Sequence, residues 1–191
     1  MAFIGMRHVV VARVTAETAG AEPTYNAGMV AGKAITGNLT INRNNNPLYA
    51  DDAIAEDDNG VTGMSLELGL DDLLENVREY MLGLVKVAGT SGSNDTYYDT
   101  EESAPYVGLG YIRVRRKNGE TKYQAVWYYK ALFGETNENS QTKGETIEWQ
   151  TPTLTGTVMG VTVNSKITYR KYQVFDTLSA AESWLDGLAG I

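Results

Sequence analysis

Residues 113–127 read RVRRKNGETKYQAVW, and this stretch decides the fold class. Asn118-Gly119 separates two β-rich runs by two residues, which is the preferred chemistry of a type I′ hairpin turn. Pairing Lys117 with Glu120 places alternate residues on opposite faces of the hairpin. One face then carries Ile112, Val114, Tyr123, Ala125 and Trp127, and the other carries Arg113, Arg115, Lys117, Lys122 and Gln124. The stretch therefore predicts a hairpin with one core face and one basic face.

Working outward from this hairpin, the same alternation of apolar and polar residues recurs along the chain. It is present in residues 9–14, 39–42, 64–70 and 167–174, and it extends the first hairpin strand back to residue 111. A period of two is typical of strands with one buried face. The chain is therefore predicted to be mainly β.

Two segments break the β pattern with helical spacing. The first has an apolar stripe of Leu70, Leu73, Leu74, Val77, Met81 and Leu84, with Asp71 as the expected N-cap and Gly83 as the expected stop. The second is expected from Ser179, because Ser179 and Glu182 match a capping box ahead of Trp184, Leu185 and Leu188. The predicted fold is an α+β arrangement in which a β-sandwich is flanked by one or two α-helices.

Three polar stretches are expected to be loops: residues 43–60, 89–105 and 134–144. Loops of this length in a compact domain are commonly functional. No internal repeat or linker divides the chain, so residues 1–191 are expected to form one domain.

Composition excludes several classes of function. The net charge of −8 disfavours a protein that grips duplex DNA, because such proteins usually present a net basic face. The chain has no cysteine, so neither a disulfide framework nor a thiolate nucleophile is available. No apolar run approaches the roughly 18 residues that a membrane span needs, and no secretory leader is recognised.

Motifs for catalysis or for cofactor binding are missing from the sequence. His8, the only histidine, lies in an alternating run and is interpreted as a strand residue. Aligning Gly60 with the invariant glycine of an EF-hand puts Ala55 and Leu66 at ligand positions, so the acidic segment 51–58 is not interpreted as a calcium loop. Gly108-Leu109-Gly110 continues into Arg113 rather than the third glycine of a phosphate-binding loop. No enzymatic activity, metal or cofactor is predicted.

Four segments, in order, resemble the major tail protein of long-tailed, siphovirus-type bacteriophages. They are Gly5-Met6-Arg7, residues 48–52 (LYADD), residues 105–111 (PYVGLGY) and residues 123–133 (YQAVWYYKALF). The resemblance implies a structural virion protein whose hexameric rings, with inner sheets joined into a barrel, stack into the tail tube. It implies assembly in the host cytoplasm, tape measure and tail completion or tip proteins as partners, and DNA as passing cargo without specific binding. Larger members append an immunoglobulin-like domain, which is not expected here.

Two groups of residues are predicted to make contacts between subunits. Segment 43–60 is expected to be mobile in the monomer and to become ordered against a neighbouring subunit or ring, through Asn44, Tyr49, Asp51, Asp52, Glu56, Asp57 and Asp58. The basic hairpin face, Arg113, Arg115, Lys117 and Lys122, is expected to meet acidic residues of an adjacent subunit rather than the DNA. Two alternative functions remain: the inner tube of a contractile tail or injection machine, and a monomeric β-sandwich binding module.

Overall fold

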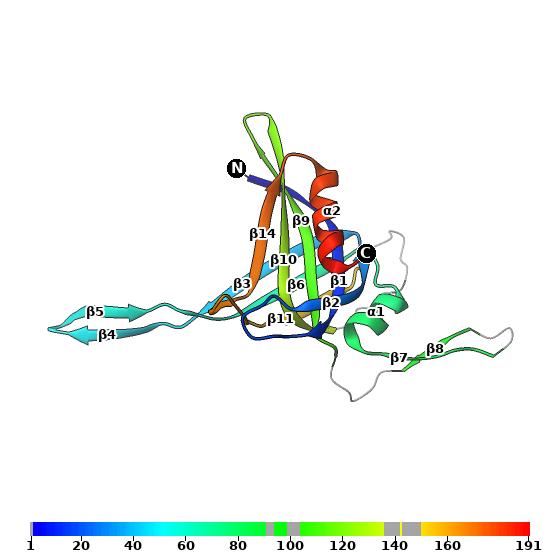
Figure 1. Cartoon of the computed structure of the whole chain (residues 1–191), viewed down its shortest axis with the longest axis horizontal. Helices are drawn as coiled ribbons and strands as arrows, with labels where there is room; N and C mark the ends of the chain where they lie inside the picture. The colour runs from blue at the N-terminus through cyan, green and yellow to red at the C-terminus, as the bar shows by residue number, and fades with distance from the viewer. Residues whose placement is uncertain (1, 91–93, 99–103, 136–141, 143–149) are drawn as a thin grey trace.

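The computed structural model describes residues 2–90, 94–98, 104–135, 142 and 150–191, and within them strands predominate (Figure 1). The strands are β1 (Ala2–Ala16), β2 (Thr24–Gly32), β3 (Ala34–Arg43), β4 (Asn46–Ala50), β5 (Ala53–Asp58), β6 (Val61–Leu70), β7 (Val85–Val87), β8 (Thr96–Tyr98), β9 (Val107–Lys117), β10 (Glu120–Glu135), β11 (Thr153–Val158), β12 (Val161–Val163), β13 (Lys166–Thr168) and β14 (Arg170–Phe175). The helices are α1 (Glu75–Leu82) and α2 (Leu178–Ala189). The predicted β-sandwich with flanking helices is confirmed.

The main sheet has the order β2-β1-β9-β10-β11-β6-β3, and β14 also pairs with β10. All of these neighbours are antiparallel. The long strand β10 belongs to both layers, because residues 123–128 pair with β14 and residues 131–135 pair with β11 along the same edge. The sheet curls until β3 lies against β1, where a Cβ on Gly37 would lie 2.6 Å from Met6 Sδ.

The predicted hairpin is present as β9 and β10, with the predicted register. Lys117 pairs with Glu120, and the turn residues Asn118 and Gly119 have φ of 52° and 83°. Two consecutive left-handed residues are what a type I′ turn requires, and Asn-Gly tolerates them best. Ile112, Ala125 and Trp127 are buried on one face, as predicted.

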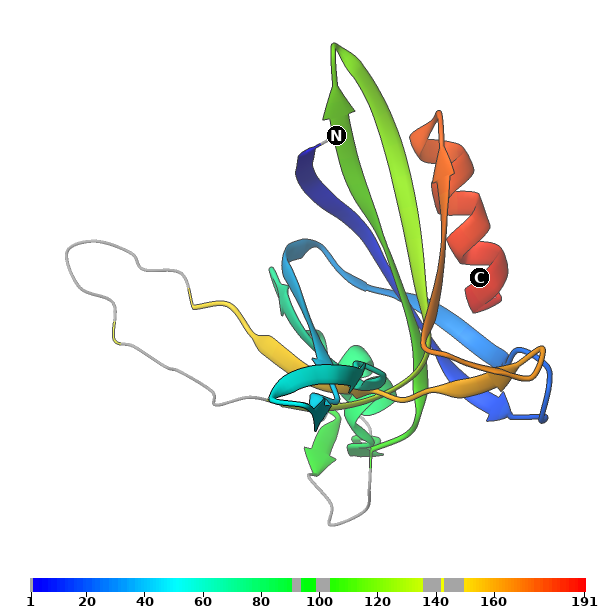
Figure 2. The same cartoon turned by 90° about the vertical axis from the view of Figure 1, so that its left-hand side faces the viewer.

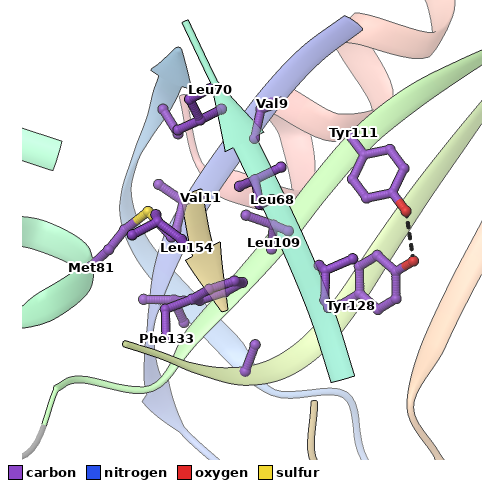
Figure 3. Close-up of a cluster of buried hydrophobic side chains, with 14 of the residues drawn as sticks. Val9, Val11, Leu68, Leu70, Met81, Leu109, Tyr111, Tyr128, Phe133 and Leu154 are labelled. Atoms are coloured by element: carbon purple, nitrogen blue, oxygen red, sulfur yellow. Dashed lines mark hydrogen bonds between the residues drawn. The ribbon is translucent and has the colours of Figure 1, made fainter. Parts of the chain in front are cut away.

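The first core lies between the two layers and is closed at one end by α1. Figure 3 shows Val9, Val11, Leu68, Leu70, Leu109 and Leu154 converging on it from four strands, with Met81 entering from α1. Tyr111 and Tyr128 share a hydrogen bond of 2.8 Å between their hydroxyls, so both buried polar atoms are satisfied. Burial raises the pKa of Tyr111, which keeps this hydroxyl protonated.

The second core lies under α2, on the other face of the sheet, around the indole of Trp127. Gly108 and Gly110 of β9 make room for this ring, because a Cβ at either position would lie 2.5 Å or 2.7 Å from Trp127 ring atoms. Tyr25 meets the indole edge-on, with ring centroids 5.0 Å apart. The glycine pair therefore makes room for the Trp127 indole.

Helix α1 ends where predicted but begins later than predicted. Gly83 is left-handed, with φ of 80°, and terminates the helix. The prediction that Asp71 is the N-cap was wrong. Its Oδ1 accepts a hydrogen bond of 2.9 Å from the Lys33 backbone N–H, so the side chain binds the β2–β3 connection instead. Leu74 takes the N-cap position, without a side-chain cap. Leu70 belongs to β6 and Leu84 lies beyond Gly83, so only the middle of the stripe, Val77 and Met81, lies within α1.

Helix α2 has the predicted apolar stripe but a different cap. Thr177 is the N-cap, and its Oγ1 accepts a hydrogen bond of 3.3 Å from Ala180 N–H. The capping box at Ser179 was therefore wrong, because a suitable hydroxyl two residues earlier starts the helix sooner. Leu185 is buried, while Trp184 and Leu188 are half-buried against the second core. Among the described residues, no helix has the length and apolarity to cross a bilayer.

Two of the predicted loops need comment. Residues 89–105 were expected to be irregular, yet β8 lies within them and pairs with β7 in a short hairpin. Tyr97 and Tyr98 supply the β propensity that the surrounding Gly, Ser and Asp residues obscured. The predicted loop at residues 134–144 falls almost wholly outside the described residues.

Arg13 fixes the C-terminal end of α1 to β1. Its Nε and Nη2 donate hydrogen bonds of 3.0 Å and 2.9 Å to the Tyr80 and Glu79 carbonyls, in a last turn that has no basic residue of its own. We expect Arg13→Ala to lower the free energy of unfolding by about 2–3 kcal/mol, since two charge-assisted hydrogen bonds are lost. Urea unfolding measures this, with exposed Arg116→Ala as the control that changes by less than about 0.5 kcal/mol. Equal stability of the two variants would show that Arg13 does not anchor α1.

Candidate interaction surfaces

Segment 43–60 is not the irregular loop that was predicted. It contains the two-stranded hairpin of β4 and β5, here called the arm (residues 44–60), which projects away from the body between β3 and β6 (Figure 1). Asp51 and Asp52 form its turn, with φ of 51° and 61°. Asp adopts the left-handed conformation more readily than most residues, so the two acids that suggested a loop make the turn of a hairpin.

The arm presents apolar side chains that its own body does not cover. Leu48, Tyr49 and Ile54 are 60%, 66% and 60% exposed. Neither of the two core clusters contains a residue of the arm. A two-stranded hairpin alone in water is marginally stable at best. Contact with another molecule would therefore cover these side chains and stabilise the arm.

The acidic residues predicted to contact a neighbour lie on this arm. Asp51, Asp52, Glu56 and Asp57 are exposed, and Asp58 is the last residue of β5. Asn44 lies at the base, where its N–H donates a hydrogen bond of 2.8 Å to the Gly60 carbonyl. Across the described residues, no group of three or more histidine or acidic side chains is placed to hold a metal ion.

The basic residues of the hairpin lie on the face of β9 and β10 opposite α2. The Arg113 and Arg115 guanidinium carbons lie 5.2 Å and 5.6 Å from the ring centroid of Phe3, which is on β1. Lys122 is different, because its Nζ lies 2.5 Å from Asp176 Oδ1. This hydrogen bond raises the pKa of the Lys122 ammonium. Lys122 is therefore partnered within its own chain, and exposed Lys117 lies near the turn.

The structure does not bring the arm acids and the hairpin cations together. The arm extends from the ends of β3 and β6. The turn of the β9–β10 hairpin lies at a different end of the body, at the tip of β9 and β10 (Figure 1). A contact between the two groups therefore requires two copies of the chain. The predicted pairing across subunits stays a prediction, and Arg113 and Arg115 are the cations best suited to test it.

Charge reversal tests that pairing. If copies of the chain assemble as predicted, we expect Arg113→Glu combined with Arg115→Glu to slow that assembly about tenfold, because electrostatic attraction raises association rates by 10-fold or more. Asp57→Lys with Asp58→Lys is expected to restore part of the rate. Turbidity or light scattering follows the growth, with Arg116→Glu on the opposite face as the matched control. Unchanged growth of the reversed protein, or cations lining the bore in a reconstruction, would contradict the pairing.

His8 is a strand residue, as predicted, but its position is unusual. It lies at a β-bulge between Arg7 and Val10, with φ of 52°. Its Nε2 lies 2.7 Å from Asp186 Oδ1, which links β1 to α2. Beyond this bulge toward the N-terminus, β1 no longer pairs with β2.

Sequence reasoning did not show that, among the described residues, β14 and the first half of β1 each have a paired strand on one side only. Exposed apolar side chains mark them: Phe3 and Ile4 on β1, and Tyr172 and Val174 on β14. The alternation in residues 167–174 signalled a strand there, but it could not show which side of that strand has a partner.

No protein-family model matches the chain, and no curated protein is significantly similar to it.

Proposed function

We propose that this chain is a structural subunit that assembles with copies of itself into the tail tube of a long-tailed bacteriophage. In this proposal, hexameric rings stack along the tail, and DNA passes through the bore during ejection. The tape measure protein and the tail completion or tip proteins are the expected partners. The resemblance of the four sequence segments suggests the family, and the structure supplies features that suit self-assembly.

The arm is the single observation that carries the proposal furthest. It extends away from the body and exposes Leu48, Tyr49 and Ile54, which a solitary monomer would leave in water. Large apolar side chains gathered on a projecting element commonly mark a surface that binds another protein. In a stack of rings, each arm would be covered by a neighbouring subunit, which would bury these side chains and stabilise the hairpin.

The charge of the chain is compatible with DNA as cargo. The wall of a tube that conducts DNA should bind the DNA weakly. Each phosphate that a Lys or Arg side chain neutralises strengthens the binding of DNA to the wall. The formal net charge of −8 disfavours a tight hold on phosphate. Six subunits that each contribute four strands would make a barrel of about 37 Å or more across, which is wide enough for a duplex.

Negative-stain microscopy of the concentrated, purified protein tests the proposal. We expect rings or tubes with sixfold symmetry. A binding module on a β-sandwich scaffold would instead show single small particles at every concentration. The inner tube of a contractile machine would also form rings, and a sheath gene beside the tube gene would distinguish it from the tail of a long-tailed phage.

A further inference from the structure

Within the described residues, the neighbouring strands β1, β9, β10 and β14 have an unpaired edge on each side, at residues 2–7 of β1 and along β14. β14 pairs with β10 on one side and with no described strand on the other. β1 pairs with β2 only from Val9 onward, so residues 2–7 have β9 on one side and no described strand paired on the other. Figure 2 shows the two edges on opposite sides of the β9–β10 hairpin, with β1 in dark blue and β14 in orange. Such edges expose backbone N–H and C=O groups and are templates for another strand.

The directions of the two edge strands are complementary. β1, β9, β10 and β14 are successive antiparallel neighbours, so β1 and β14 run in opposite directions. A second copy that is related to the first by rotation about an axis parallel to the strands has β1 and β14 running in the same directions as in the first copy. The β14 strand of one copy would therefore meet β1 of the next copy as an antiparallel partner. The β2 edge is less suitable, because β2 runs with β14 and would pair with it in parallel, the slightly weaker arrangement.

The side chains along both edges also match. Residues that pair across neighbouring strands lie on the same face of a sheet. Phe3 pairs with Arg115, and Val174 pairs with Gln124, which in turn pairs with Arg113. Tyr172 is two residues from Val174 and so lies on the same face. Phe3, Tyr172 and Val174 therefore share the face that α2 does not cover, and all three are exposed. Aromatic and β-branched side chains are favourable cross-strand neighbours. Joining the edges would pair the backbone groups and bury apolar side chains at the same time.

We propose that copies of this chain join edge to edge, with β14 of one copy pairing antiparallel with residues 2–7 of β1 of the next. The sheet then continues from subunit to subunit, and the interface joins two different surfaces, which permits closure into a ring. This inference rests on the proposed self-assembly and names the two strands that carry it.

Cysteine crosslinking tests the joint, and the natural chain offers a clean background because it has no cysteine. Phe3→Cys is combined in turn with Arg170→Cys, Tyr172→Cys or Val174→Cys, which occupy alternate positions along β14. Each protein is assembled and then treated with oxidant or with a short bismaleimide, so that the result does not depend on disulfide geometry alone. We expect at least one combination to give a covalent ladder beyond the dimer on a denaturing gel. Mixtures of the corresponding single-cysteine chains should stop at dimers.

The matched control places the first cysteine on the β2 edge, as Val30→Cys, with the same three partners. Val30 is exposed like Phe3, and we expect no ladder from it. Tubes that form without any ladder from Phe3→Cys, or with a ladder from Val30→Cys instead, would overturn the assignment of the edges and leave the tube proposal standing. Particles that stay monomeric at every concentration and never crosslink would overturn both.

Discussion

Deletion of residues 44–57 is expected to leave a folded monomer that no longer forms tubes. The deletion removes the arm almost entirely, including Leu48, Tyr49 and Ile54. Only Asp58, Asn59 and Gly60 then remain between Arg43 and Val61, which pair across β3 and β6. A three-residue loop that contains glycine closes a hairpin well, so the body sheet is retained. If the exposed apolar residues dominate the contact between rings, the concentration needed for assembly should rise by at least about 100-fold.

Circular dichroism and thermal unfolding check the fold of the deletion variant, and microscopy checks its assembly. A pair of point variants separates the apolar contact from the hairpin itself. Tyr49→Ser with Ile54→Ser should weaken assembly strongly, whereas Tyr49→Phe with Ile54→Val retains apolar surface and should assemble normally. Normal tubes from the deletion variant would contradict a role for the arm in assembly.

Replacing Trp127 by Ala is expected to cost about 3–5 kcal/mol of unfolding free energy, a large share of the roughly 5–15 kcal/mol of a typical domain. The indole is fully buried at the centre of the second core. It lies over Gly108 and Gly110, so its removal leaves a cavity that glycines cannot fill. Leu185 of α2 packs in the same cluster, and we therefore expect α2 to loosen first.

Urea unfolding measures this cost, and hydrogen exchange of the α2 amides reports the local loosening. Trp127→Phe retains an aromatic ring and should cost less than half as much as Trp127→Ala. A loss below about 1 kcal/mol for Trp127→Ala would show that the second core does not hold α2 to the sheet.

Local sequence signals predicted the local structure well. The Asn118-Gly119 turn fixes its own geometry, so the β9–β10 register and the basic face could be deduced without knowledge of the rest of the chain. Gly83 likewise terminates α1 because the left-handed conformation suits glycine. The start of α1 could not be deduced, because Asp71 hydrogen-bonds to Lys33 and that contact exists only in the folded chain.

Long-range relations were not accessible from the sequence. The density of Asp and Asn in residues 44–60 indicated a loop, whereas two of those acids form the turn of the arm. The unpaired edges of β1 and β14 depend on which strands become neighbours, and a sequence pattern shows only that a strand exists. The contact between the arm residues and the hairpin cations across subunits stays a prediction.

Self-assembly is the central claim, and light scattering as a function of protein concentration tests it most directly. The account predicts that the mass rises from the 20.8 kDa of one chain, through about 125 kDa for a ring of six, to long tubes. A mass that stays at 20.8 kDa at every concentration would contradict it.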